Sequence, residues 1–194
     1  MANRRNNHLS FALTIWFLGA FFFFCEYFLR VFPSVMIPQL SDKFGITAAG
    51  LGALSAFFYY PYIFMQIPVG VITDKFGPRR VMSVAAIVTG VACVLFAMSN
   101  NLTLAVVARM LMGFCGAFAF VGTLRIAINW FTPKVFAMLT GVTQAMGMLG
   151  AAFGDAPVSF YVQHVGVEVA MASFAVLFFI SLVLSLRMKE VKSR

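Results

Sequence analysis

An acidic and a basic side chain lie four residues apart in the first long apolar stretch of the chain, at Glu26 and Arg30. Residues i and i+4 share one face of a helix, so we expect the two groups to form an ion pair. Ionisable groups inside apolar spans usually face the interior of a bundle or a water-filled cavity, where they serve a function. A purely structural pair, or an arginine near the outer interface, remains the alternative.

Two more arginines and one aspartate fall within apolar stretches. Arg109 precedes Gly113 and Gly116 at spacings that place all three near one helical face. Arg125 turns to nearly the opposite side, close to the end of its stretch, where its long side chain can reach the interface. Asp155 lies near the end of another stretch, as a gate, an interfacial cap or a bystander.

Residue types that do covalent chemistry are not grouped in this chain. His8 and His164 are isolated, and the three cysteines, Cys25, Cys93 and Cys115, each lie within an apolar run without a ligand partner at metal-binding spacing. We therefore expect buried thiols, no metal site, no cofactor and no enzyme activity.

The composition indicates a membrane protein. Of 194 residues, 62% are apolar and only 10% are charged, whereas a soluble domain is roughly half apolar and about a quarter charged. A membrane helix needs about 20 apolar residues, so six of them would use about 120. These values exclude a soluble enzyme, a disordered tail and a disulfide scaffold.

The apolar stretches predict an all-α membrane protein with six transmembrane helices. We expect a segment 1–9 before the bundle, a bundle over 10–187 and a basic tail at 188–194. The expected spans are 10–38, 48–72, 81–98, 102–128, 137–158 and 169–186.

The basic residues are distributed unevenly between the two sets of connectors. Ten of the 14 lysines and arginines lie at the amino end, in the second and fourth connectors and in the tail, whereas the alternate connectors hold only Lys43. The positive-inside rule then places both termini in the cytoplasm. The formal charge of +8 is explained by this topology, so we expect no nucleic-acid partner.

The second connector carries the sequence Gly-Val-Ile-Thr-Asp-Lys-Phe-Gly-Pro-Arg-Arg at 70–80. We expect Gly70 to permit a close helix contact and Gly77 to form a tight turn. Asp74 is placed to meet a helix amino terminus or an arginine. The pair that closes the motif, Arg79 and Arg80, would anchor the next helix at the membrane surface.

This connector resembles the signature loop of the major facilitator superfamily, G-x-L-A-D-R-x-G-R-R, at its usual place between the second and third helices. The matching positions are Gly70, Asp74, Lys75, Gly77, Arg79 and Arg80, and the departures are Ile72, Thr73 and Pro78. The resemblance implies one six-helix half of a transporter in the inner cell membrane, whose two halves rock to give alternating access. By resemblance, Asp74 would lock against a second six-helix half, which this chain does not contain.

The resemblance also implies roles for the charges within the spans. Arg30 would hold a carboxylate of a small polar solute, an organic acid or amino acid, and Glu26 would carry a coupling proton. Arg109 matches the superfamily pattern R-x-x-x-G-x-x-G, which is tied to coupling or gating, and Asp155 is a further candidate for that network. Tyr60 in the second span is a candidate for a polar path to the solute.

The fifth span leaves the direction of transport open. Gly141, Gly150 and Gly154 follow the superfamily's antiporter spacing, but Asp155 stands where that pattern has proline. The last two glycines form a G-x-x-x-G pair, which permits close helix packing. A non-transporting half and an exporter of drugs or sugars are the alternative functions.

Overall fold

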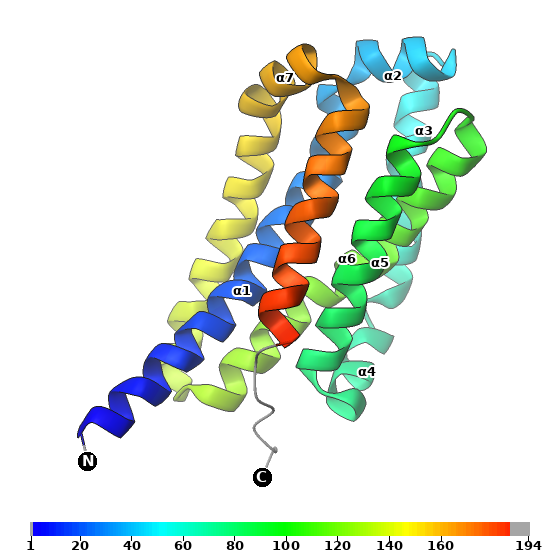
Figure 1. The fold of residues 1–194 in the computed structure, drawn as a ribbon. Helices are drawn as coiled ribbons and strands as arrows, with labels where there is room; N and C mark the ends of the chain where they lie inside the picture. The colour runs from blue at the N-terminus through cyan, green and yellow to red at the C-terminus, as the bar shows by residue number, and fades with distance from the viewer. Residues whose placement is uncertain (1, 187–194) are drawn as a thin grey trace.

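The structure, a computed structural model, describes the backbone of residues 2–186 and the side chains of residues 10–154 and 160–179. This part of the chain contains seven helices and no strand (Figure 1): α1 (Ala2–Val35), α2 (Ile37–Phe44), α3 (Ala48–Met65), α4 (Pro68–Phe76), α5 (Pro78–Ala97), α6 (Leu102–Trp130) and α7 (Pro133–Leu186). Six stretches are long and apolar enough to cross a membrane, so the expected all-α bundle is confirmed. Helix α1 includes most of segment 1–9, and the expected tail 188–194 lies outside the described residues.

Local sequence signals set the ends of the helices. Prolines occupy the first turns of α2, α4 and α5, where a missing N–H costs nothing. The side chains of Thr47 and Asn101 accept hydrogen bonds from the first turns of α3 and α6. Gly45, Gly77 and Gly166 have positive φ angles of 62°, 82° and 84°. At each of these glycines the chain leaves one helix and changes direction.

Three of the expected boundaries differ from the structure. The expected span 10–38 ends at Val35 and is followed by the separate helix α2. The expected span 48–72 is divided between α3 and α4, because the chain breaks just before Pro68. The expected separation of spans 137–158 and 169–186 is reduced to a single non-helical residue, Gly166, within α7.

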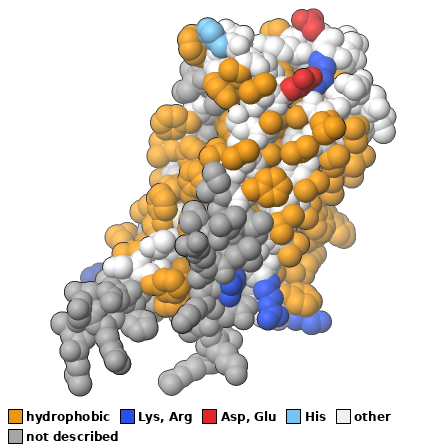
Figure 2. All heavy atoms as spheres, in the orientation of Figure 1, with side chains coloured by type: hydrophobic (Ala, Val, Ile, Leu, Met, Phe, Trp, Pro, Cys, Tyr) orange, Lys and Arg blue, Asp and Glu red, His pale blue; other side chains and the backbone are white. Residues whose placement is uncertain are grey.

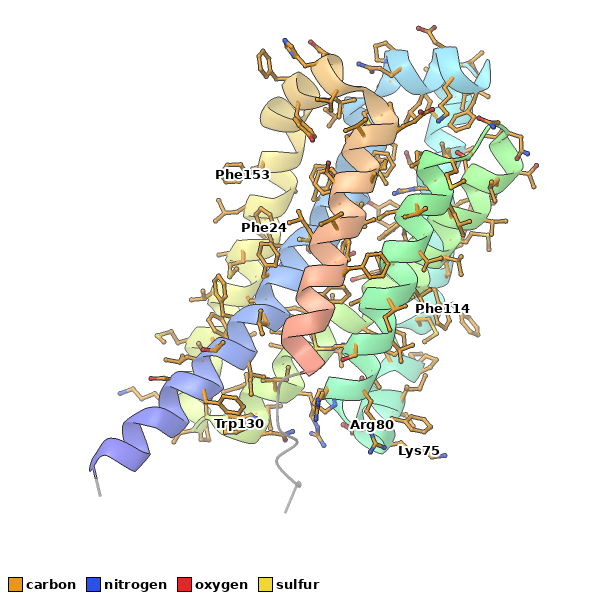
Figure 3. All side chains as sticks on the ribbon, in the orientation of Figure 1. Phe24, Lys75, Arg80, Phe114, Trp130 and Phe153 are labelled. Atoms are coloured by element: carbon orange, nitrogen blue, oxygen red, sulfur yellow. The ribbon has the colours of Figure 1, made fainter. Side chains whose placement is uncertain are left out.

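The helices form one bundle whose two ends differ in charge. The main contacts of α1 are with α7 and α6, and α6 also packs against α3 and α5. The beginning of α1, the end of α7 and helix α4 lie at one end of the bundle, and α2 lies at the other (Figure 1). Lysines and arginines gather at the first end on the face seen in Figure 2, and Figure 3 places Lys75 and Arg80 there. The basic residues that are unevenly distributed along the sequence thus lie mainly at one end of the bundle on this face (Figure 2).

Glycines bring neighbouring helices to close approach. A Cβ atom on Gly113 of α6 would collide with the backbone of Phe58 in α3, and one on Gly150 of α7 would collide with the backbone of Phe24 in α1. A Cβ atom on Gly154 would lie 2.8–2.9 Å from side-chain atoms of α1. The predicted close packing at the G-x-x-x-G pair is therefore confirmed, with α1 as its partner.

A lysine links three helices at the end of the bundle that carries α2. The Lys43 ammonium group donates hydrogen bonds of 3.1 Å both to the Ala97 carbonyl oxygen and to the Glu168 carboxylate. Ala97 is the last residue of α5, where unpaired carbonyl groups attract cations. Helix α2 is thereby attached to the ends of both α5 and the second part of α7.

A methyl group added at Gly150 should destabilise the bundle, whereas the same change at Gly141 should not. Figure 3 shows Phe24 and Phe153 side by side near this contact, with ring centroids 6.2 Å apart. We expect Gly150→Ala to lower the free energy of unfolding by about 1–3 kcal/mol through overpacking. Thermal unfolding of the purified protein in detergent measures the difference.

Gly141→Ala is the matched control on the same helix, because no atom lies within 4 Å of its added Cβ. Alanine favours helix over glycine by up to about 1 kcal/mol, so this variant should be as stable as the parent or more so. Equal stability of the two variants would contradict the close contact between α1 and α7.

Candidate functional site

Glu26 and Arg30 form an ion pair within the bundle. The Arg30 Nη2 atom donates a hydrogen bond of 2.7 Å to the Glu26 Oε1 atom, one helical turn earlier on α1. The Glu26 side chain is only 2% exposed, whereas that of Arg30 is 15% exposed. The pairing expected from the sequence is confirmed, and the arginine is the member of the pair that an incoming group can reach.

Aromatic rings surround the Arg30 guanidinium group. Its Cζ atom lies 4.4 Å from the ring centroid of Tyr27 and 4.5 Å from that of Tyr62. The rings of Phe58 and Tyr59 follow at 5.8 Å and 5.9 Å. Ring faces attract cations, most strongly where water is excluded. Helix α3 thus supplies three rings that hold the cation in place.

The tyrosines of this region have different surroundings. The Tyr27 hydroxyl oxygen accepts a 3.2 Å hydrogen bond from Gln144, which brings α7 to the edge of the site. Tyr60 is 64% exposed and is not among the four rings around Arg30. Its expected role in a polar path stays a prediction. Tyr62 belongs to the same aromatic run but was not among the expected site residues, and neither was Gln144.

Arg109 lies on α6 and is completely buried against α1, the helix that carries the ion pair. Its Nη1 atom donates a 2.6 Å hydrogen bond to the Leu29 carbonyl oxygen of α1. Its guanidinium carbon lies 4.8 Å from the Phe58 ring centroid and 5.2 Å from that of Phe32. The Nε and Nη2 atoms have no hydrogen-bond partner among the described residues.

Small residues on α6 make room for these charges. A Cβ atom on Gly116 would lie 2.9 Å from the Glu26 Cγ atom and 3.0 Å from its Oε1 atom. Gly113 allows the contact with α3 described above, and Arg109 bonds to α1. The predicted shared face of these three residues is confirmed, because Arg109 and Gly116 contact α1 and Gly113 contacts α3, the two helices that surround Arg30. The Glu26 Oε2 atom has no hydrogen-bond partner among the described residues.

The signature connector contains a second ion pair, at the end of the bundle where α4 lies. The Asp74 carboxylate lies 3.0 Å from Arg125 Nε, and the two side chains are 59% and 37% exposed. The expected contact of Asp74 with an arginine is confirmed, although the sequence did not indicate which arginine. The turn predicted at Gly77 is confirmed by its positive φ angle. The close helix contact expected at Gly70 is wrong within these helices, because a Cβ atom added there would meet no atom within 4 Å.

Other expected groups add no chemistry to the described part of the chain. The three cysteines are buried and free. No cluster of His, Cys, Asp and Glu that could hold a metal ion occurs among the described residues. The Asp155 side chain lies outside the described residues, so its expected place in a coupling network stays a prediction.

Six apolar helices, an ion pair inside the bundle and basic residues gathered at one end (Figure 2) define a multi-pass membrane protein. The sequence profile of the Major Facilitator Superfamily matches residues 15–194. The chain belongs to this superfamily, whose members are transporters and not enzymes.

Several curated proteins are similar to this chain. The probable sulfoacetate transporter SauU of Cupriavidus necator is 34% identical over 130 residues, 67% of this chain and 30% of that protein. The nitrate/nitrite transporter NrtP of a Picosynechococcus species is 32% identical over 59% of this chain and 21% of its own. The probable anion transporter 5 of Arabidopsis thaliana is 30% identical over 66% of this chain and 30% of its own length. The matched part of this chain thus spans less than a third of each relative.

The two ion pairs should differ in their contribution to stability. Removing the charge of Glu26 leaves the Arg30 cation with a neutral amide in a largely dry setting, so we expect Glu26→Gln to cost about 2 kcal/mol. The Asp74 pair is exposed and screened, so Asp74→Asn should cost less than about 1 kcal/mol. Unfolding of both variants in the same detergent measures the contrast. A larger loss for Asp74→Asn would contradict this account of the site.

Proposed function

We propose that this chain forms one half of a secondary transporter for small organic anions, and that Arg30 holds the negative group of the solute. The observation that carries the proposal is a partly exposed guanidinium group inside a membrane bundle, fixed by one carboxylate and four aromatic rings. Arginine offers two parallel N–H groups to a carboxylate or sulfonate, which gives both affinity and orientation. One of its Nη atoms is bound to Glu26.

The names of the relatives support an anion as the solute. Three of the similar proteins are named as transporters of sulfoacetate, of nitrate and nitrite, and of anions. A cationic anchor suits such solutes better than an uncharged sugar or a cationic drug, which were the alternatives from sequence. Organic acids and amino acids both remain within this class, since each carries a carboxylate.

Glu26 is the group we assign to proton coupling. An anion that binds to Arg30 competes with the Glu26 carboxylate for the same cation. A buried carboxylate that has lost its partner is costly, and taking up a proton removes that cost. Binding of the anion and protonation of Glu26 therefore support one another, which is the requirement for transport of an anion together with a proton.

The complete transporter would need a second six-helix half, opposite the site. In the most apolar 18-residue stretches of α3 and of the span Pro133–Gly154 only 22% of the residues are buried, against 61% in that of the first span. Both helices therefore have exposed side chains available for a second half or for lipid. We propose that the two halves rock about Arg30 and Glu26 to give alternating access, in the manner of inverted and parallel repeats in other transporters.

Replacing Arg30 should abolish anion binding and uptake while membrane insertion stays intact. We expect Arg30→Ala to lower the affinity for sulfoacetate at least tenfold, because the cation that pairs with the sulfonate or carboxylate is lost. Titration of the purified chain in lipid nanodiscs with sulfoacetate, acetate and nitrate measures binding, with acetamide as the neutral comparison. Uptake is measured in proteoliposomes after the chain is joined to a second six-helix half.

Lys134→Ala is the matched control, because Lys134 is an exposed cation in the first turn of α7. It should bind and transport as the parent does. Glu26→Gln should still bind the anion but should transport it without an accompanying proton, measured as a lost change in external pH. Unchanged uptake by Arg30→Ala would remove Arg30 from the site and favour a different solute class.

The same proposal places the protein in the inner cell membrane, with both termini in the cytoplasm, because the basic end of the bundle faces inward. Cysteines introduced at exposed positions test this orientation. We expect Lys75→Cys to react with a membrane-impermeant maleimide only after the cells are opened, and Asn100→Cys to react from outside. The native cysteines are buried and give a low background. The reverse labelling pattern would overturn the orientation.

A further inference from the structure

Helix α1 lacks one of its backbone donors next to the site. Pro33 lies within α1 and has no N–H group. In an α-helix that N–H group would donate to the carbonyl oxygen four residues earlier, which belongs to Leu29. The Leu29 carbonyl group directly precedes Arg30. The proline therefore leaves an acceptor without its usual helical donor at the residue that adjoins the candidate anion-binding arginine.

Arg109 supplies the missing donor from another helix. Its Nη1 atom bonds to the Leu29 carbonyl oxygen at 2.6 Å, and its side chain is 0% exposed. The rings of Phe32 and Phe58 lie on its guanidinium group at 5.2 Å and 4.8 Å. A buried polar group without a partner is destabilising, because it has lost its hydrogen bonds to water. The bond thus satisfies the carbonyl group and one nitrogen of the arginine together.

The depth of Arg109 separates its role from that of Arg30. Arg30 is 15% exposed, whereas Arg109 is enclosed between α1, α3 and α6. A solute that reaches Arg30 would still have to displace an aromatic ring to reach Arg109. The contact that Arg109 makes is with the backbone of α1, at the residue next to Arg30.

We propose that Arg109 is a positioning residue: its bond to the Leu29 carbonyl oxygen replaces the hydrogen bond that Pro33 removes and holds Arg30 in its binding position. Without this bond, α1 has a proline break that is free to open beside the site. The claim that Arg30 binds the anion rests on the proposed function. The claim that Arg109 closes the proline break does not depend on it.

A double-mutant cycle tests the proposal, because alanine at position 33 restores the missing N–H group. In Arg109→Met the Leu29 carbonyl group loses its donor, and in Arg109→Met/Pro33→Ala the helix itself supplies one. We expect hydrogen exchange of α1 backbone amides around Leu29 to increase in the single variant and to return to the parent rate in the double variant. Pro33→Ala alone should change it little.

Anion affinity follows the same cycle. We expect Arg109→Met to weaken sulfoacetate binding about tenfold, equivalent to about 1.4 kcal/mol. The double variant should bind within about threefold of the parent. If Arg109 instead acts through its charge, Pro33→Ala will not rescue binding and Arg109→Lys will, and that result would overturn the proposal.

Arg109→Met/Pro61→Ala is the matched control, since Pro61 is an interior proline of the neighbouring helix α3. It should show no rescue. If Arg109→Met fails to fold, the proposal requires that Pro33→Ala restores folding and that Pro61→Ala does not. Exchange rates that Pro33→Ala leaves unrescued would also overturn it.

The two readouts separate the two claims. A parent protein that binds none of the anions would contradict the proposed function, while hydrogen exchange, which needs no ligand, would still decide whether Arg109 closes the proline break. Rescue of exchange without rescue of binding would show that the break is closed but does not position Arg30, and would overturn that part of the proposal.

Discussion

A charge enclosed by helices in a membrane has no water to hydrate it, so its partners must come from the protein itself. Two guanidinium groups and one carboxylate take their partners from α1, α3 and α6, while the Glu26 Oε2 atom and two nitrogens of Arg109 have no hydrogen-bond partner among the described residues. Arg30 is bound by Glu26 and by aromatic rings, and Arg109 by the Leu29 carbonyl group and two phenylalanine rings. The charges and the packing of the three helices therefore depend on one another. Gly116 illustrates this dependence, because any larger residue would push the carboxylate aside.

Features that rest on short spacings were predicted correctly from sequence. The Glu26–Arg30 pair follows from the i, i+4 geometry of a helix, and the turn at Gly77 from the need for a positive φ angle. The close approach at Gly150 and Gly154 follows from their spacing along one helix. The number of spans follows from hydropathy and length alone. In each case the physical cause lies within a few residues of chain.

Features that depend on which helices become neighbours were not predicted. The partner of Asp74 is Arg125, far along the chain, and nothing local to either residue signals the pair. Three of the four rings around Arg30 come from α3, and the sequence alone singled out Tyr60 in place of Tyr62. The contact expected at Gly70 does not occur within these helices. Such pairings follow from the tertiary arrangement, which spacing along one helix does not determine.

The ammonium group of Lys43 also constrains how the bundle is able to move. It holds α2 to the last carbonyl group of α5 and to the Glu168 carboxylate just beyond the break at Gly166. Separating the tips of these helices requires both hydrogen bonds to break. A tilt that leaves both bonds intact moves the joined ends of α2, α5 and α7 together, as one rigid body.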